Sequence, residues 1–290
     1  EIYCYKILSI DPNHMDSLFL LATISALSGD FNKAKKLLHK VIEIEPKNTI
    51  AIHNLATAYK ELGKLEEATN YYKKVLEINS KHVNANYNLG LIFYKQNEIK
   101  KAKSYLQKTT ELQNNYAIAF FSLANVHVDL KEFEDALSCY QKAIEINPNL
   151  VSAHNNLGLV FRGFNDYENA ISCYQKAIQI QPNHAGAHHN LALAFKELGE
   201  FEKAIKSHQM AIQYEPENLT HHHFLSELKK DILDPTLKNK IKKIIENDKS
   251  KITNIAYGNY LLSKYERKTK NYEKELYYLI KGHQNFFNSR

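Results

Sequence analysis

The sequence predicts an all-α solenoid, because markers of several kinds return along the chain at a constant spacing of 34 residues. One marker is an apolar helix pattern, as in "HNNLGLVF" (154–161), where Leu157, Val160 and Phe161 have the i, i+3, i+4 spacing of a buried stripe. A small residue recurs at Ala34, Ala68, Ala102, Ala136, Ala170 and Ala204. Proline recurs at Pro12, Pro46, Pro148, Pro182 and Pro216, with Ser80 and Asn114 in the two remaining slots. Independent markers that keep one period predict a stack of similar helical units.

A frame that begins at Met15 divides the middle of the chain into repeats without an insertion. The six predicted repeats are 15–48, 49–82, 83–116, 117–150, 151–184 and 185–218. Residues 1–14 have the pattern of the second helix of a repeat, so we expect a truncated repeat there and a natural N-terminus further upstream. Residues 219–290 are predicted to form divergent helical repeats and a C-terminal cap, since terminal repeats often differ from the rest. The apolar stripe of the sixth repeat continues in Leu225, Leu228 and Ile232.

Each repeat is predicted to contain two helices joined by a tight turn. In the second repeat, the stripes of the two helices are Ile52, Leu55, Ala56 and Tyr59, then Ala68, Tyr72, Val75, Leu76 and Ile78. The turn needs a left-handed residue, and its occupants are Gly29, Gly63 and Gly199, with Asn97 and Asn165 as usual substitutes and Lys131 as the exception. Alanine at the twentieth position lets the two antiparallel helices approach closely.

The repeat resembles the tetratricopeptide repeat (TPR), which has the same period. The shared pattern is Leu-Gly/Ala-x-x-Tyr/Phe, then Gly-x-Phe/Tyr-x-x-Ala, then Tyr and Ala, then Pro. In the fifth repeat the matching residues are Leu157, Gly158, Phe161, Tyr167, Ala170, Tyr174, Ala177 and Pro182. The pattern is weaker where Leu38 and Leu106 replace the tyrosine and Thr109 replaces an alanine. The resemblance implies an all-α, right-handed TPR superhelix (α-solenoid) of helix-turn-helix repeats.

Asparagine recurs at the sixth position of the repeats, although it is neutral to unfavourable inside a helix. The buried positions of the first helix leave positions two, five, six, nine and twelve on an adjoining face. In TPR superhelices this face lines the concave groove, and we call it the groove face. The asparagine file along it consists of Asn54, Asn88, Asn156 and Asn190, with Ser122 in the fourth repeat. An amide has donors and an acceptor, so the file is predicted to hold a peptide backbone; the alternative is that each amide only bridges neighbouring helices.

The asparagine file resembles the asparagine ladder in the TPR superhelix of the O-linked N-acetylglucosamine transferases. The resemblance covers the middle of the array, because the same position holds Leu20 at one end and Phe224 at the other. The other predicted peptide-binding residues are His53, Lys60, Tyr87, Lys95, Phe121, Asn125, Asn155, Arg162, His189 and Lys196. Their cationic and aromatic character predicts an extended, somewhat acidic peptide. The carboxylate clamp of chaperone-cofactor TPRs needs Lys at position five and Asn at position nine, and Phe121 with Asn125 does not meet it.

Charge, histidine and cysteine usage argue against other classes of ligand. The net charge is +6, yet only Arg162, Arg267 and Arg290 are arginine, so we predict no nucleic-acid partner. No apolar run approaches the roughly 20 residues of a membrane span, so we predict no membrane partner. Consecutive histidines such as His188 and His189 diverge on a helix, so we expect groove histidines rather than a metal site, and no cofactor. Three cysteines without a CxxC motif predict free thiols and a cytoplasmic location.

Catalytic signatures such as GxxxxGK[ST], GxGxxG, GxSxG and HExxH are missing from the sequence, so the chain itself is not expected to be an enzyme. The predicted function is a protein-protein interaction scaffold that binds an extended segment in the groove. The alternative is the recruiting arm of a sulfotransferase or glycosyltransferase whose catalytic domain lies outside the chain, since the C-terminal segment resembles the linker of TPR-sulfotransferases. A third possibility is a structural spacer or self-associating module. The oligomeric state and the identity of the ligand stay open.

Overall fold

The computed structural model describes residues 1–229, 235–247 and 251–288, and these residues form α-helices without any strand. The all-α class predicted from the sequence is therefore confirmed. Within the same ranges, none of the helices has the length and apolarity that crossing a membrane requires. The helices fall into two compact units, residues 1–148 and 149–290, which we call the first and second units.

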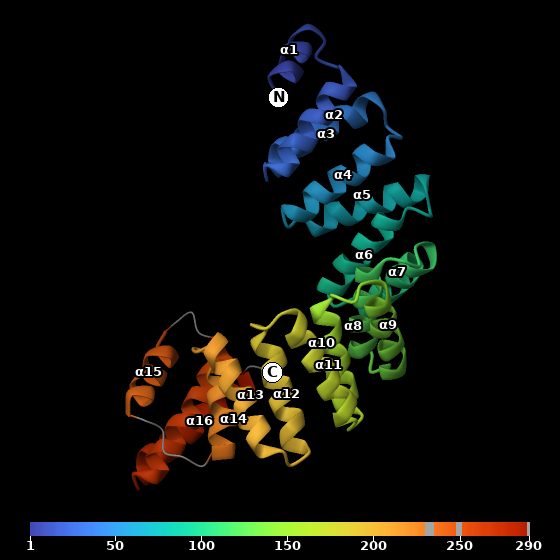
Figure 1. Ribbon diagram of the computed structural model, residues 1–290. Coiled ribbons are helices and arrows are strands. Elements are labelled where there is room, and N and C mark those ends of the chain that lie inside the picture. Colours follow the sequence, from blue (N-terminus) through green and yellow to red (C-terminus); the bar gives the residue numbers. More distant parts are fainter. Residues whose placement is uncertain (230–234, 248–250, 289–290) are drawn as a thin grey trace. The chain divides into compact units, whose positions relative to one another are not determined.

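The first unit consists of successive helix pairs (Figure 1). Its helices are α1 (Ile2–Ile10), α2 (Met15–Leu27), α3 (Phe31–Ile44), α4 (Thr49–Glu61), α5 (Leu65–Ile78), α6 (Val83–Lys95), α7 (Ile99–Leu112), α8 (Ala117–Asp129) and α9 (Phe133–Ile146). The two helices of each pair pack against each other, and the second helix of a pair also packs on the first helix of the next, as α3 does on α4 and α5 on α6. This is the nearest-neighbour packing of a solenoid.

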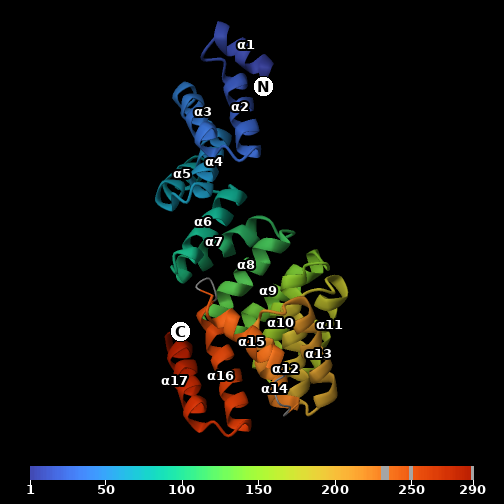
Figure 2. The ribbon, with the colours of Figure 1, turned by 90° about the vertical axis from the view of Figure 1, so that its left-hand side faces the viewer.

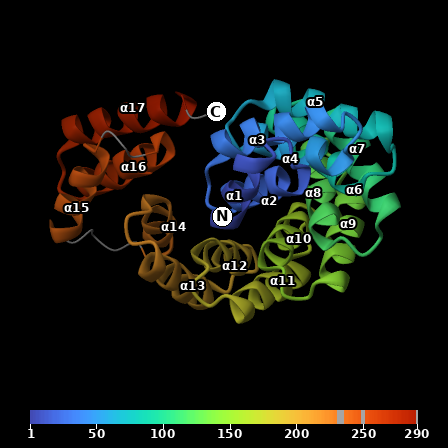
Figure 3. The ribbon, with the colours of Figure 1, turned by 90° about the horizontal axis from the view of Figure 1, so that it is seen from above.

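The second unit continues the pairs and then departs from them. Its helices are α10 (Val151–Gly163), α11 (Tyr167–Ile180), α12 (Ala185–Glu197), α13 (Phe201–Tyr214), α14 (Leu219–Lys229), α15 (Pro235–Ile245), α16 (Ile252–Lys268) and α17 (Tyr272–Asn288). The long helices α16 and α17 lie side by side (Figure 2), and α14 lies between α13 and α16 (Figure 3). Leu228 of α14 packs on the cluster around Leu191 and Phe195, while the predicted Ile232 lies outside the described residues.

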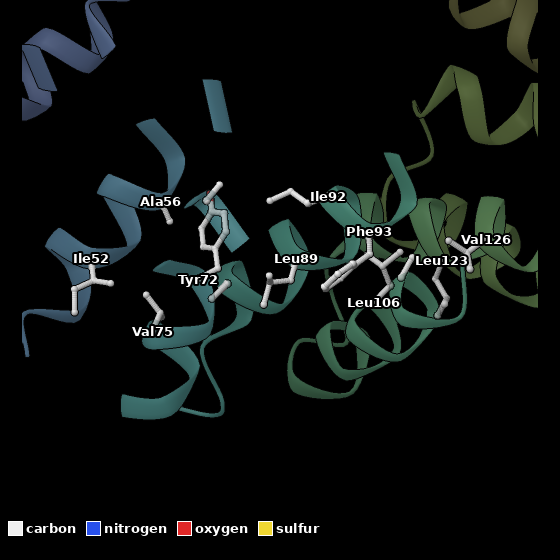
Figure 4. Packing of buried hydrophobic residues seen from close by; sticks show 13 residues of the cluster. Ile52, Ala56, Tyr72, Val75, Leu89, Ile92, Phe93, Leu106, Leu123 and Val126 are labelled. Carbon is white, nitrogen blue, oxygen red and sulfur yellow. The ribbon is translucent and has the colours of Figure 1, made fainter. Parts of the chain in front are cut away.

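The small residues of the repeat lie where the helices of a pair meet. All six alanines of the twentieth position, Ala34 to Ala204, are fully buried. Figure 4 shows a core cluster of the first unit, in which Tyr72 and Leu106 occupy one slot of successive repeats and are also fully buried. The predicted stripe of α5 is wrong at its last residue, because Ile78 ends the helix and is 43% exposed.

The turns within the pairs use left-handed backbone, as the glycines and asparagines predicted. Gly63 and Gly199 have φ of +75°, and Asn97 and Asn165 have φ of 60°. Lys131 adopts the same conformation with φ of 62°, so the exception in residue type does not change the turn. A side chain with a Cβ is disfavoured here by about 1–2 kcal/mol, and the turn geometry of the pair outweighs this cost.

The left-handed turn at Lys131 leads to a first prediction about stability. Replacing the exposed Lys131 by Gly removes the Cβ that crowds a left-handed residue, and we expect the free energy of unfolding to rise by about 1 kcal/mol. Lys131→Ala is the matched control, because it shortens the side chain and keeps the Cβ. The thermal midpoints of both variants measure the difference. Equal midpoints for Gly and Ala would contradict the prediction.

Candidate functional site

The asparagine file of the first unit is half-buried and hydrogen-bonded. Lys60 of α4 donates from Nζ to Oδ1 of Asn88 on α6 over 3.0 Å, so this bond links the first helices of two successive pairs. The Nδ2 of Asn88 donates to the carbonyl oxygen of Asn84 at 2.8 Å. Oδ1 of Asn54 lies 3.4 Å from Nδ1 of His53. Asn88 therefore lies beside Lys60, and Asn54 and Asn88 both use part of their hydrogen-bonding capacity within the protein.

The fourth repeat interrupts the file in this unit. Ser122 donates to the carbonyl oxygen of Ile118 in its own helix at 2.8 Å. Lys95, at the end of α6, is exposed. The aromatic residues at position five of the repeats contact other aromatic rings. The Tyr87 ring, for example, lies 5.1 Å from that of Tyr116.

Position nine joins the groove face to the core. Oγ1 of Thr57 lies 2.9 Å from the hydroxyl of the buried Tyr72, and the hydroxyl of Tyr140 donates to Oδ1 of Asn125 at 2.5 Å. The rings at position five lie above the same tyrosines, with His53 at 5.5 Å from Tyr72. Asn125, predicted as a ligand contact, therefore also holds a core tyrosine in place.

A cavity opens on the groove face of the first unit between α2, α3 and α4. Its volume is about 350 Å³. The lining residues are Ala22, Thr23, Ala26, Leu27, Phe31, Leu38, Asn54, Thr57, Ala58 and Glu61. Asn54 of the file thus borders a mostly apolar hollow. A cavity with a few polar groups among apolar walls is typical of a site that holds a side chain of a ligand.

In the second unit the amides bond to one another. Nδ2 of Asn190 on α12 donates to Oδ1 of Asn155 on α10 at 3.0 Å, and Nδ2 of Asn155 donates to Oδ1 of Asn156 at 3.2 Å. The three amides form one chain that crosses from one pair to the next. Asn155 both donates and accepts in this chain, and an amide has two donor hydrogens and two acceptor lone pairs.

Histidines gather beside this chain. The His189 ring lies 5.2 Å from His208, 4.9 Å from His221 and 5.3 Å from Phe224. His208 is fully buried in the slot that holds tyrosine in other repeats, and neither of its ring nitrogens has a hydrogen-bond partner among the described residues. Burial lowers the pKa of His189 to about 3 and that of His208 to about 4. These rings are therefore neutral at pH 7.

Two of the predicted cations flank the histidines. Lys196 Nζ lies 3.5 Å from Oε2 of Glu227 and 6.0 Å from the centroid of the Phe224 ring. Arg162 is half-buried, and its Nη1 has no hydrogen-bond partner within the part of the chain that the structure describes. The positive charge of Lys196 is thus paired with a carboxylate, whereas Arg162 has no ion pair with any residue that the structure describes.

A metal-binding arrangement occurs away from the groove histidines. Among the described residues, one group brings enough donor atoms within reach of a single ion, namely His127, Glu132 and Asp135. Nδ1 of His127 lies 2.6 Å from Glu132, and Lys103 Nζ donates to both oxygens of the same carboxylate at 2.9 and 2.7 Å. The ammonium group of Lys103 already bonds to the Glu132 carboxylate. We therefore interpret these side chains as an ion-pair network that joins α7 to the following helix pair.

The cysteines are free thiols. Burial raises the pKa of Cys139 and that of Cys173 to about 11. Both thiols are therefore protonated at neutral pH and poor nucleophiles.

Sequence reasoning missed two residues of the second helices that lie behind this face, His208 and Tyr174. The signal was present in the repeat frame. His208 stands in the tyrosine slot, and position nine holds Leu159 in the fifth repeat where Thr57 stands in the second. Comparing slots across repeats, rather than residues along one repeat, would have identified them.

Stacked helix pairs with a polar face along their first helices define a class of protein, the helical-repeat scaffold for protein interactions. The chain belongs to the tetratricopeptide repeat family. Residues 56–97, 124–162 and 165–199 match the family described as TPR repeat. Further matches to families described as tetratricopeptide repeat cover residues 25–70, 83–116 and 187–220.

Solved structures of TPR proteins share the fold. YrrB, described as a TPR protein with an unusual peptide-binding site, is 26% identical, with a TM-score of 0.58 over 64% of this chain and 96% of YrrB. MamA is 26% identical, with a TM-score of 0.54 over 56% of this chain and 95% of MamA. Pseudomonas aeruginosa PilF is 21% identical, with a TM-score of 0.65 over 73% of this chain and 97% of PilF, and supports the fold alone. No curated protein gives a significant match.

Proposed function

We propose that the groove face binds an extended peptide segment of a partner protein. The observation that carries the proposal is the position of Asn54, Asn88, Asn156 and Asn190, which are all half-buried on the face of the first helices that the neighbouring pairs do not cover completely. Amides that are partly open to solvent and fixed by bonds to their neighbours are preorganised to meet the amides of a peptide backbone.

Two further observations support this proposal. The cavity of about 350 Å³ beside Asn54 offers an apolar hollow for a ligand side chain. YrrB, a similar TPR protein, has a peptide-binding site. The expected partner is acidic because Lys60, Arg162 and Lys196 hold the twelfth position of the first helix in their repeats. The sulfotransferase or glycosyltransferase alternative and the cytoplasmic location stay predictions from the sequence.

The following experiment tests whether the asparagines of the file bind a peptide or only bridge neighbouring helices. Peptides selected from a random library on the wild-type chain are titrated against the double variant Asn156→Ala, Asn190→Ala. We expect a loss of affinity of about tenfold to a hundredfold, since each net hydrogen bond contributes about 0.5–1.5 kcal/mol. The denaturation midpoint should change little by comparison.

Asn48→Ala serves as the control, because Asn48 accepts a hydrogen bond from Ala51 N as a helix cap and lies outside the groove face. This change should cost about 1 kcal/mol of stability and leave the affinity unchanged. If the Asn156 and Asn190 variant loses stability like the cap variant and its folded fraction keeps full affinity, the amides only bridge helices.

A further inference from the structure

Three repeats carry a buried tyrosine in the same slot of their second helix, and one of the three hydroxyls has no partner in the part of the chain that the structure describes. Tyr72 is within 2.9 Å of Thr57, and Tyr140 donates to Asn125. Tyr174 is fully buried, but its hydroxyl has no hydrogen-bond partner among the described residues. The reason is local, because position nine of this repeat is Leu159, which has no polar atom. An unmet buried hydroxyl costs about 1–3 kcal/mol, so a stable fold keeps few of them.

Two other buried polar groups without a partner among the described residues lie on α10 and α12, the two helices that pack on α11. Arg162 on α10 has a buried Nη1 without a partner in the described ranges, and His189 on α12 has a buried Nδ1 in the same condition. Tyr174 lies against α10, since a Cβ on Gly158, four residues before Arg162, would lie 2.5 Å from its Cε1, and it packs in one core cluster with Leu191 of α12, two residues after His189. The charge of Arg162 also acts on the pKa of both Tyr174 and His189. The three groups therefore belong to one cluster within the second unit.

The cluster lies along the asparagine chain described above. Asn155, Leu159 and Arg162 follow one another at i, i+4 and i+7, so they share one face of α10. Asn155 bonds to Asn190 on the neighbouring α12, and Leu159 between them is 36% exposed. A peptide held by the amides would thus pass Leu159 and reach Arg162.

The chemistry of the cluster selects the ligand group. Arg162 is a permanent donor, and the hydroxyl of Tyr174 and a ring N–H of His189 are further donors. A carboxylate has two oxygens that accept bidentate bonds from a guanidinium and is strengthened by each additional donor. A cation would be repelled by Arg162, and an apolar group would leave all three donors unmet. The cluster therefore fits an anionic oxygen group of a ligand.

We propose that Arg162, with Tyr174 and His189 behind it, forms a subsite for the side-chain carboxylate of an Asp or Glu in the bound peptide. This inference rests on the proposed function and names the residue type read by the second unit. It differs from capture of a C-terminal carboxylate, since the donors are an arginine, a core tyrosine and a histidine in the middle of the repeat array. An acidic residue beside an apolar one, which would contact Leu159, is the expected ligand sequence.

The side-chain NMR signals of arginine give a direct test, because the chain contains only three arginines. The full chain labelled with 15N is titrated with Ala-Leu-Asp-Ala-Ala, acetylated and amidated so that the only carboxylate is that of the Asp. The Nε–H signal of Arg162 is assigned by its loss in Arg162→Gln. We expect a saturating shift of this signal, and at least a tenfold weaker response to the same peptide with Asn in place of Asp.

Two tyrosine variants provide matched controls. Tyr174→Phe should weaken binding of the Asp peptide several-fold without changing the response to the Asn peptide. Tyr72→Phe removes a hydroxyl that is already bonded to Thr57, so it should leave the affinity of the Asp peptide unchanged. A stability loss in either variant is followed separately by thermal melting.

Distinct outcomes would overturn the subsite. Equal responses to the Asp and Asn peptides, or a shift of Arg267 as large as that of Arg162, would contradict it. A response to inorganic phosphate but not to the Asp peptide would replace it with a free-anion site. Library peptides that bind tightly without any acidic residue would refute the subsite while the groove function stands. If no library peptide binds and the Asp peptide gives no saturating shift, the groove function fails and the subsite fails with it.

Discussion

Acidification from pH 7.5 to pH 5 is expected to destabilise the second unit around α12, α13 and α14. The cause is the group of buried histidines, His189, His208 and His223, whose pKa values are all lowered by burial. In the unfolded chain each ring has a pKa of about 6.5 and is protonated at pH 5. In the folded chain the rings stay neutral until the pH reaches about 3 for His189 and about 4 for His208.

The sign follows from proton binding. Between pH 6.5 and the lowered folded pKa values, the unfolded state binds more protons than the folded state, so stability falls as the pH falls. The loss begins near pH 6.5 and stops growing once the folded rings also become protonated. At pH 5 each fully buried ring contributes a loss of at most ~2 kcal/mol. Because His189 and His223 keep some contact with solvent, we expect about 4 kcal/mol for the group.

Hydrogen–deuterium exchange resolves the effect by helix, which matters because solenoids open locally rather than all at once. After correction for intrinsic exchange, α12 to α14 should lose protection between pH 7.5 and pH 5. Helix α7, which contains no histidine, is the internal reference. His208→Leu is the matched variant, since Leu38 and Leu106 fill the same slot in other repeats. It should reduce the pH dependence of α13, and an unchanged pH dependence would exclude His208 as its source.

The sequence predicted the fold well because a solenoid is specified locally. Each helix pair buries its stripe against the next pair, so the period of markers such as Ala68 and Ala102 is enough to place the helices. The turns were equally predictable, because only a few residue types accept positive φ without cost. Lys131 shows the limit of this reasoning: the packing of the pair, not the identity of the residue, sets the backbone conformation there.

The candidate site was predictable only in part. The shared slot of Asn88 and Asn190 gave each the same position on its own helix. Nothing in the slot showed that Asn88 would accept from Lys60 or that Asn190 would donate to Asn155. Such bonds depend on the side-chain conformations of residues roughly one repeat apart. The buried donors of the second unit were hidden for the same reason. The Tyr174 hydroxyl has no partner among the described residues because of the pairing of two slots, which no single residue reveals.

The C-terminal helices also depend on a contact that the repeat pattern does not contain. Gly258 of α16 is buried in the cluster formed by Leu219, Ile241, Leu261 and Leu262. A Cβ at this glycine would lie 2.4 Å from Cγ2 of Ile245 and 2.7 Å from Cδ1 of Leu219. These distances are shorter than van der Waals contact, so α16 approaches α14 and α15 closely only because residue 258 has no side chain.

Gly258→Val is therefore expected to separate α16 from α14 and α15. The branched side chain brings three carbon atoms into a space that does not admit one, and overpacking of this kind costs typically 1–3 kcal/mol, with about 3 kcal/mol expected here. Gly258→Ala should cost less, since the atoms that it meets are the flexible ends of Ile245 and Leu219.

Gly163→Ala is the control, because nothing lies within 4 Å of its added Cβ at the end of α10, and alanine favours a helix by about 1 kcal/mol over glycine. Urea denaturation of the three variants gives the order of stability. A Val variant as stable as the Gly163→Ala variant would show that these helices do not depend on the close approach at Gly258.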